Sequence, residues 1–248
     1  MNATSYWLVM PAAGRGRRIA TDIPKQYLTL AGRSMIEWAL APFLADGRCL
    51  GAMLALSKDD PHWAGCRSRL ARPVFETEGG AERADSVRAA LEALCARGVS
   101  EKAWVLVHDA ARPCVSGSEI DALIGAVTHQ GEADQAGGLL AVPLADTLKR
   151  GQLGASAVQG VTSVETLARE GLWRALTPQM FRLGALRAAL QAAAARGRVP
   201  TDEAQAMEWQ GATPVLVSGE SSNIKVTTAA DLSIAESLLH AHRSGASS

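Results

Sequence analysis

The sequence has no excess of charge of either sign. Its 25 lysine and arginine residues match 25 aspartate and glutamate residues, so the formal net charge is zero. Proteins that coat nucleic acid or bind a membrane surface usually carry a strong basic excess. The composition therefore argues against both kinds of partner, and any binding of anions must come from a local cluster of cationic side chains.

Closely spaced cysteines and long apolar runs are also absent. Cys49, Cys66, Cys95 and Cys114 include no C-x-x-C pair, so neither a zinc knuckle nor a redox motif is indicated. No apolar run is long enough to span a bilayer, and the run at Tyr6–Pro11 is too short for a secretory segment. We therefore expect free thiols in a reducing compartment, and we predict a cytoplasmic protein.

Short apolar runs alternate with helix-like segments along most of the chain. Strands are expected at Tyr6–Met10, Leu50–Leu56, Trp104–Val107, Gly138–Pro143 and Asn223–Val226, and helices after the capping boxes at Ser34 and Ser116 and over Arg83–Arg97. This order predicts a mostly parallel sheet with helices on both faces. The 248 residues are enough for one large α/β domain, which we predict to cover residues 1–248.

The alternation breaks between Ala145 and Glu170. This stretch is rich in glycine, serine, threonine and valine, and it has no helical stripe. A structureless loop of this length is uncommon inside a compact domain. We predict that residues 145–170 form a projecting β-arm, and arms of this kind often serve dimerisation.

The loop after the first strand, PAAGRGRR, is followed by Pro24-Lys25-Gln26 and combines glycines with cations. Glycines allow backbone N–H groups to approach a phosphate chain, and the arginines and lysine suit a triphosphate. A dinucleotide-binding loop would need a small residue where Ile19 stands, and no Gly-Lys-Ser/Thr follows as in a Walker A loop. A solvated basic loop is the remaining alternative.

A second loop, Gly79-Gly80, leads into a helix N-terminus. Backbone groups there can read the edge of a base, and Ser86 can add a hydrogen bond. A tight turn in which Ser86 only packs explains the same pattern equally well.

Asp109 follows a buried strand, at the sheet edge where open α/β folds bind ligands. A carboxylate in that position commonly handles Mg²⁺ or a substrate hydroxyl, and Arg112 is either its ion-pair partner or a second ligand-binding group. His108 more often packs than catalyses. Lys225 lies between apolar neighbours on the short strand expected at Asn223–Val226.

No Ser-His-Asp constellation, G-x-S-x-G elbow or H-E-x-x-H motif stands out in the sequence. A reaction whose nucleophile is already charged needs none of these. A phosphate monoester is such a nucleophile, because its second pKa lies near 6.

Taken together, these segments resemble the 2-C-methyl-D-erythritol 4-phosphate cytidylyltransferases of the non-mevalonate isoprenoid pathway. The resemblance runs from about Trp7 to Leu239 through the motifs PAAGRGRR, PKQYL, GGAERADSV, VLVHDAARPC, DTLKR, LWRALTPQMF, TDEAQAMEWQG and NIKVT. It implies a Rossmann-like nucleotidyltransferase fold, a homodimer joined through the arm, and transfer of CMP from CTP to methylerythritol phosphate with release of pyrophosphate. A ribitol-5-phosphate cytidylyltransferase, which shares the fold and the CTP half, is the alternative.

The resemblance also implies a role for individual residues. Around CTP they are Ala12, Ala13, Gly14 and Gly16 at the phosphates, Gly80 and Ser86 at the cytosine, and Arg18 and Lys25 at the charge that builds on the α-phosphate. Around the acceptor they are Asp109, Thr147 and Thr201, with Arg169 and Lys225 positioning the attacking phosphate, and some of these come from the partner subunit's arm. Mg²⁺ would be held mainly by CTP oxygens, with Asp109 as a candidate ligand.

Overall fold

A seven-stranded sheet forms the centre of the computed structural model, which describes residues 4–14, 23–70, 72–129, 136–153 and 160–245. In the order of the sheet, the strands are β11 (Val215–Ser218), β7 (Gly138–Pro143), β10 (Trp173–Arg182), β6 (Trp104–Val107), β1 (Tyr6–Pro11), β4 (Cys49–Leu56) and β5 (Val74–Glu78). Neighbouring strands are parallel except that β10 runs antiparallel to β6 and β7.

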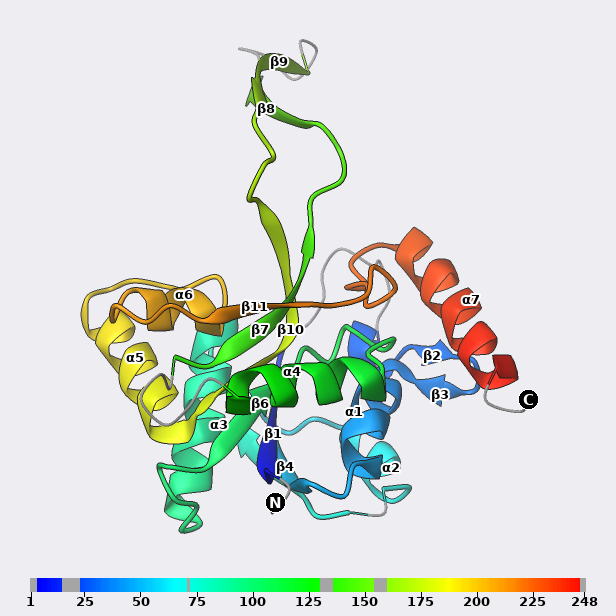
Figure 1. Ribbon diagram of the computed structural model, residues 1–248. Helices are drawn as coiled ribbons and strands as arrows, with labels where there is room; N and C mark the ends of the chain where they lie inside the picture. The colour runs from blue at the N-terminus through cyan, green and yellow to red at the C-terminus, as the bar shows by residue number, and fades with distance from the viewer. Residues whose placement is uncertain (1–3, 15–22, 71, 130–135, 154–159, 246–248) are drawn as a thin grey trace.

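Helices cover both faces of this sheet (Figure 1). Helices α1 (Met35–Ala45) and α4 (Gly117–His129) pack on one face, and α3 (Arg83–Ala96) and α5 (Leu183–Ala195) pack on the other. The remaining helices are η1 (Lys25–Tyr27), α2 (Trp63–Arg67), α6 (Glu203–Glu208) and α7 (Ala229–Gly245). The three layers and the mostly parallel sheet confirm the predicted fold class.

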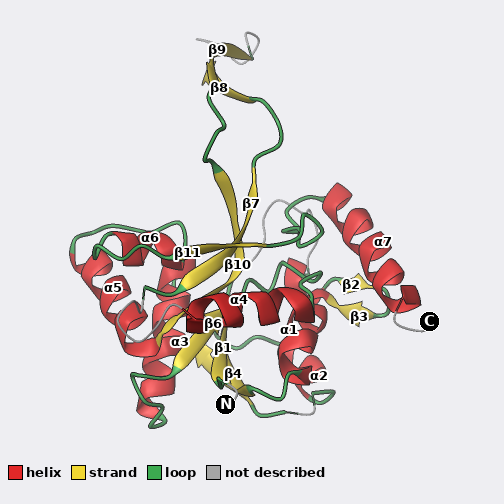
Figure 2. Cartoon of the chain, in the orientation of Figure 1, coloured by secondary structure: helices red, strands yellow, loops and turns green. Residues whose placement is uncertain are grey.

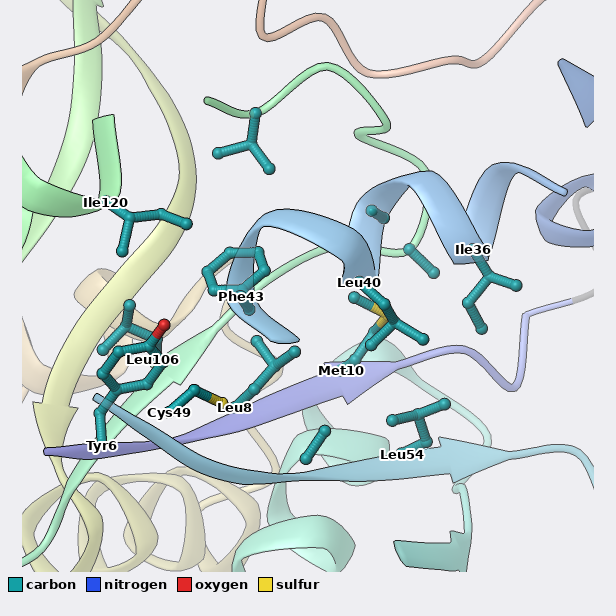
Figure 3. Packing of buried hydrophobic residues seen from close by; sticks show 14 of the residues in the cluster. Tyr6, Leu8, Met10, Ile36, Leu40, Phe43, Cys49, Leu54, Leu106 and Ile120 are labelled. Carbon is teal, nitrogen blue, oxygen red and sulfur yellow. The ribbon is translucent and has the colours of Figure 1, made fainter. Parts of the chain in front are cut away.

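Strand β1 shows how the sequence separates the two layers. Leu8 and Met10 belong to the core cluster under α1, whereas Val9 belongs to the cluster under α3, as the two-residue period of a strand requires. Figure 3 shows Leu8 and Met10 packed against Leu40 and Phe43 of α1. All five side chains are fully buried, and each contributes about 1.5–3 kcal/mol relative to an exposed position. This packing fixes the point at which the loop after β1 begins.

Helix α1 begins at the capping box expected from the sequence. The Glu37 carboxylate accepts hydrogen bonds from the backbone N–H of Ser34 (2.9 Å) and from its hydroxyl (2.6 Å). The box at Ser116 forms in the same way before α4, where the Ser116 N–H donates to the Glu119 carboxylate at 3.0 Å.

An antiparallel hairpin of β8 (Leu148–Leu153) and β9 (Val161–Leu167) projects from the body of the molecule (Figure 1). It lies within the segment predicted as a β-arm. Val161 and Val164 expose 65% and 52% of their surface on it, and exposed apolar side chains in such a position suit contact with another protein surface. A smaller hairpin of β2 (Thr29–Leu30) and β3 (Arg33–Ser34) lies by α7 (Figure 2).

Two features of the fold differ from the sequence-based expectations. Strand β10 was not predicted, and it contains Pro178 although proline usually excludes a central strand. The structure accommodates Pro178 through an irregular register against β7 between Ala175 and Gln179. The strand expected at Asn223–Val226 was wrong, because this segment is an irregular loop. In the described part of the chain, no helix combines the length and apolar character needed to cross a membrane.

Candidate active site

A cavity of about 190 Å³, which we call the first cavity, opens beside the carboxyl ends of β1 and β6. It is lined by the following residues predicted from the sequence: Ala12, Ala13, Gly14, Lys25, Gly80, Ser86, Asp109 and Lys225. Gly16 and Arg18 lie outside the described residues. Five separate segments of the chain therefore meet at the sheet edge where the sequence predicted a ligand.

The loop after β1 is held in place by side chains from two other segments. The buried Gln26 donates to the Ala12 carbonyl oxygen at 2.8 Å, and the Ser57 hydroxyl donates to the Ala13 carbonyl oxygen at 3.0 Å. Because these bonds occupy carbonyl groups of the loop, they fix its path along the first cavity.

The glycines of the Gly79-Gly80 turn are required by close contacts. A Cβ atom on Gly80 would lie 2.3 Å from the Cβ of Asp85, and one on Gly79 would lie 2.5 Å from the Cβ of Ala13. The Ser86 hydroxyl accepts from the Gly80 N–H (3.1 Å) and donates to the Glu82 carbonyl (3.2 Å), which leaves one lone pair for a ligand. Ser86 therefore shapes the turn and retains one acceptor for a base.

Asp109 is the centre of a cluster of charges. Its Oδ1 accepts from Arg83 Nε at 2.8 Å, its Oδ2 lies 2.8 Å from Lys225 Nζ, and Arg112 Nε is 3.9 Å away. Burial alone would raise the pKa of Asp109, but the charges of Arg83 and Lys225 lower this pKa well below its usual range. The carboxylate is therefore ionised throughout the physiological range and cannot act as a proton donor.

A second cavity of about 220 Å³ lies on the other side of this cluster. Arg83, Asp109 and Lys225 line both cavities, and Thr201, also predicted from the sequence, lines the second one. Two ligands that occupied the two cavities would therefore meet at Asp109.

The loop that carries Lys225 is positioned by a buried asparagine instead of by a sheet. Asn223 Nδ2 donates to the carbonyl oxygen of Thr177 (3.0 Å) and to the carboxylate of Glu119 (3.2 Å). The Asn223 carbonyl in turn accepts from Arg112 at 2.7 Å. These contacts explain how Lys225 reaches Asp109 without the expected strand.

His108 is linked to the backbone of Asp109 through the Thr177 hydroxyl. Its Nε2 lies 3.0 Å from the Arg112 carbonyl oxygen, which can only accept, so Nε2 carries the proton. Nδ1 then accepts from the Thr177 hydroxyl (3.0 Å), and the Thr177 oxygen accepts from the Asp109 N–H (3.1 Å). Burial lowers the pKa of His108 to about 4, so the ring is neutral and structural at pH 7.

We expect Thr177→Val to destabilise the protein by about 1–3 kcal/mol, because it leaves the buried N–H of Asp109 and the Nδ1 of His108 without partners. Urea unfolding monitored by circular dichroism measures the change. The exposed Thr213→Val variant is the matched control and should stay within about 0.5 kcal/mol of the parent. Equal stability of both variants would contradict this hydrogen-bond chain.

Nearly the whole chain is similar to one family of known proteins. The family model described as 2-C-methyl-D-erythritol 4-phosphate cytidylyltransferase matches residues 6–241. The chain belongs to this family. A cytidylyltransferase of this name from Halorhodospira halophila is 50% identical over 242 residues, which cover 96% of this chain and 95% of the relative. Another from Ectopseudomonas mendocina is 47% identical over 230 residues, covering 93% and 94%.

Solved cytidylyltransferase structures share the fold. A crystal structure of 4-diphosphocytidyl-2C-methyl-D-erythritol synthase is 32% identical, with a TM-score of 0.80 and coverage of 96% of this chain and 99% of that one. The cytidylyltransferase from Francisella tularensis is also 32% identical, with a TM-score of 0.74 and coverage of 95% and 100%. These likenesses confirm the predicted family, and they do not favour the ribitol phosphate alternative.

Two of the residues expected to bind the acceptor do not line either cavity of their own chain. Thr147 is exposed just before β8, and Arg169 is exposed in the turn after β9, where its carbonyl accepts from the Leu172 N–H at 3.0 Å. Neither residue lines the first or the second cavity. Both belong to the projecting arm.

Arg83, Thr177, Gln179 and Glu203 lie within the sequence motifs, but no role was predicted for any of them. Arg83 and Glu203 are the first residues of helices α3 and α6, and Thr177 and Gln179 lie in the interrupted strand β10. The sequence feature that could have pointed to Thr177 and Gln179 is a pair of polar residues flanking Pro178 in an otherwise apolar segment.

Proposed function

We propose that this chain transfers CMP from CTP to 2-C-methyl-D-erythritol 4-phosphate, giving 4-diphosphocytidyl-2-C-methyl-D-erythritol and pyrophosphate. The chain is a nucleotidyltransferase by family. The observation that carries the proposal is the sharing of Arg83, Asp109 and Lys225 by two cavities, one beside the glycine-rich loop and one beside Thr201. A nucleotide and an acceptor bound there would have their reacting groups at the shared wall.

The reaction is an in-line displacement at the α-phosphorus of CTP. An oxygen of the acceptor phosphate forms the new bond to phosphorus while the bond to the bridging oxygen breaks, and pyrophosphate leaves with that electron pair. The acceptor phosphate is mostly dianionic at neutral pH, so no general base is required. This agrees with the ionised Asp109 and the neutral, buried His108.

Catalysis then depends on bringing two anions together and neutralising their charge. We assign Lys25 and Arg18 to the α-phosphate, and Lys225 to the acceptor phosphate. Arg112 adds to the positive charge on the acceptor side, because it lines the second cavity and its Nε lies 3.9 Å from Asp109 Oδ2.

We further propose that Mg²⁺ accompanies CTP and binds mainly to its phosphate oxygens. Asp109 does not fit a metal ligand in this arrangement, because both of its oxygens already pair with Arg83 and Lys225. Within the described ranges, no group of three or more His, Cys, Asp or Glu residues is placed to hold a metal ion. When bound, the ion would neutralise charge on the departing pyrophosphate.

The arm supports a homodimer in which each subunit completes the site of the other. Thr147 and Arg169 are exposed on the arm and line neither cavity of their own chain, so we assign them to the acceptor site of the partner subunit. Exposed apolar side chains at Val161 and Val164 would be covered by this contact. We place the enzyme in the cytoplasm, in keeping with its four free cysteines.

Pyrophosphate release tests the proposed function directly. Purified protein with Mg²⁺ and CTP should release pyrophosphate with methylerythritol 4-phosphate and much more slowly with ribitol 5-phosphate or with no acceptor. Replacing CTP by UTP or ATP is the control for the base. Release with ribitol 5-phosphate at the higher kcat/KM, or with no acceptor dependence, would contradict the proposal.

A further inference from the structure

Glu203 is a buried carboxylate that lines neither cavity itself but binds Arg83, which lines both. It exposes 1% of its surface and lies in the first turn of α6. Its two oxygens accept from the two terminal nitrogens of Arg83, at 2.6 Å from NH1 and 3.0 Å from NH2. The Nε of the same guanidinium donates to Asp109 Oδ1 at 2.8 Å.

Stability alone gives a weak reason for this arrangement. Removing two charges from water costs several kcal/mol per ion, so a buried ion pair often stabilises a fold no better than apolar residues of the same size. What the bidentate geometry does supply is direction, since a carboxylate that binds both terminal nitrogens fixes the plane of the guanidinium. With that plane fixed, Arg83 offers only its Nε to Asp109.

The first turn of α6 is itself anchored to the central sheet. Asp202 caps the helix by accepting from the Gln205 N–H at 2.9 Å, and its other oxygen accepts from Gln179 of β10 at 2.9 Å. The side-chain amide oxygen of Gln179, Oε1, accepts from the Ala204 N–H at 2.8 Å. Glu203 is thus held between bonds on both sides, which makes its carboxylate a fixed support for Arg83.

We propose that Glu203 and Arg83 are positioning residues for the transfer reaction. Glu203 restrains the guanidinium so that Arg83 takes one oxygen of Asp109 and leaves the other to Lys225. Without this restraint, the terminal nitrogens of Arg83 would be released to bind both oxygens of Asp109 in the bidentate manner that arginine favours, and Lys225 would share its oxygen with a second cation. The inference rests on the proposed function, and it predicts a defect on the acceptor side of the site.

The test is a kinetic comparison of Glu203→Gln, Arg83→Gln and the double variant. Glu203→Gln should lower kcat/KM for the acceptor roughly 30- to 100-fold, the scale of one charge-assisted hydrogen bond, while KM for CTP stays within about 3-fold. The double variant should be no more than about 3-fold worse than Arg83→Gln alone, because Glu203 acts through Arg83. Glu208→Gln, on the exposed side of the same helix, is the control and should retain parental kinetics.

Several outcomes separate this role from a purely structural one. Independent, multiplying losses in the double variant, or equal losses toward CTP and acceptor, would overturn the proposal. Glu203→Asp keeps the charge on a shorter side chain and should recover part of the acceptor kcat/KM, and it replaces Glu203→Gln if that variant does not fold. Turnover by the parent enzyme is measured first, so that failure of the proposed function itself is recognised before any variant is compared.

Discussion

Replacing Lys25 by methionine is expected to lower kcat by roughly 10²–10³, the loss that follows removal of one preorganised donor from a developing anion. Lys25 lines the first cavity, and its ammonium donates to the Val226 carbonyl oxygen at 3.0 Å. That bond holds the ammonium at the junction of the glycine-rich loop and the Lys225 loop. Methionine preserves the length of the side chain and removes the charge.

Steady-state kinetics with saturating acceptor measures this effect. Lys102→Met removes an exposed lysine just before β6, at the end of that strand away from the cavities, and should leave kcat within about 2-fold. A Lys25→Met enzyme with unchanged kcat and a raised KM for CTP would show that Lys25 binds the ground state and the transition state equally. That result would remove Lys25 from the transition state while leaving it in the nucleotide site.

The sequence predicted secondary structure best where neighbouring residues alone determine it. The capping boxes at Ser34 and Ser116 placed the starts of two helices, and the short apolar run ending at Val107 placed the strand that precedes Asp109. Because parallel strands end at one edge of the sheet, these local elements also predicted where Ala12, Gly80 and Asp109 would meet.

Prediction failed where long-range contacts decide the structure. Lys225 was assigned to a strand on the pattern of its neighbours, yet the segment is held by a hydrogen bond between Asn223 and Thr177, residues 46 positions apart. The partnership of Arg83 with Glu203 spans 120 positions and leaves no periodic trace in the sequence. Family resemblance named the residues that we expect to contact ligands, whereas the residues that hold them in place became visible only in the structure.

Removing the charge of Asp109 should have the second large effect. Asp109→Asn is expected to lower kcat/KM for the acceptor by roughly 10²–10³, because three cations, Arg83, Arg112 and Lys225, surround this single carboxylate. Breaking a buried ion pair by removing one partner costs about 3–5 kcal/mol, since the other charge stays buried without compensation. The asparagine amide can also place an N–H donor against the Lys225 ammonium, which is itself a donor. Lys225 should therefore move away from its position.

A pH profile distinguishes this electrostatic role from acid–base catalysis. The pKa of Asp109 is lowered, so its contribution is complete above the ordinary aspartate pKa of about 3.9 and is lost only as the pH falls further, through the folded-state value. The acidic limb of kcat/KM should therefore lie near pH 6, where the acceptor phosphate loses its second proton, in both the parent and Asp109→Asn. Asp121→Asn, which removes an exposed aspartate paired with Arg48, controls for the loss of an ion pair elsewhere. If the limb disappeared in Asp109→Asn and not in Asp121→Asn, Asp109 would be a titrating base, and the assignment of the nucleophile to an already ionised phosphate would be wrong.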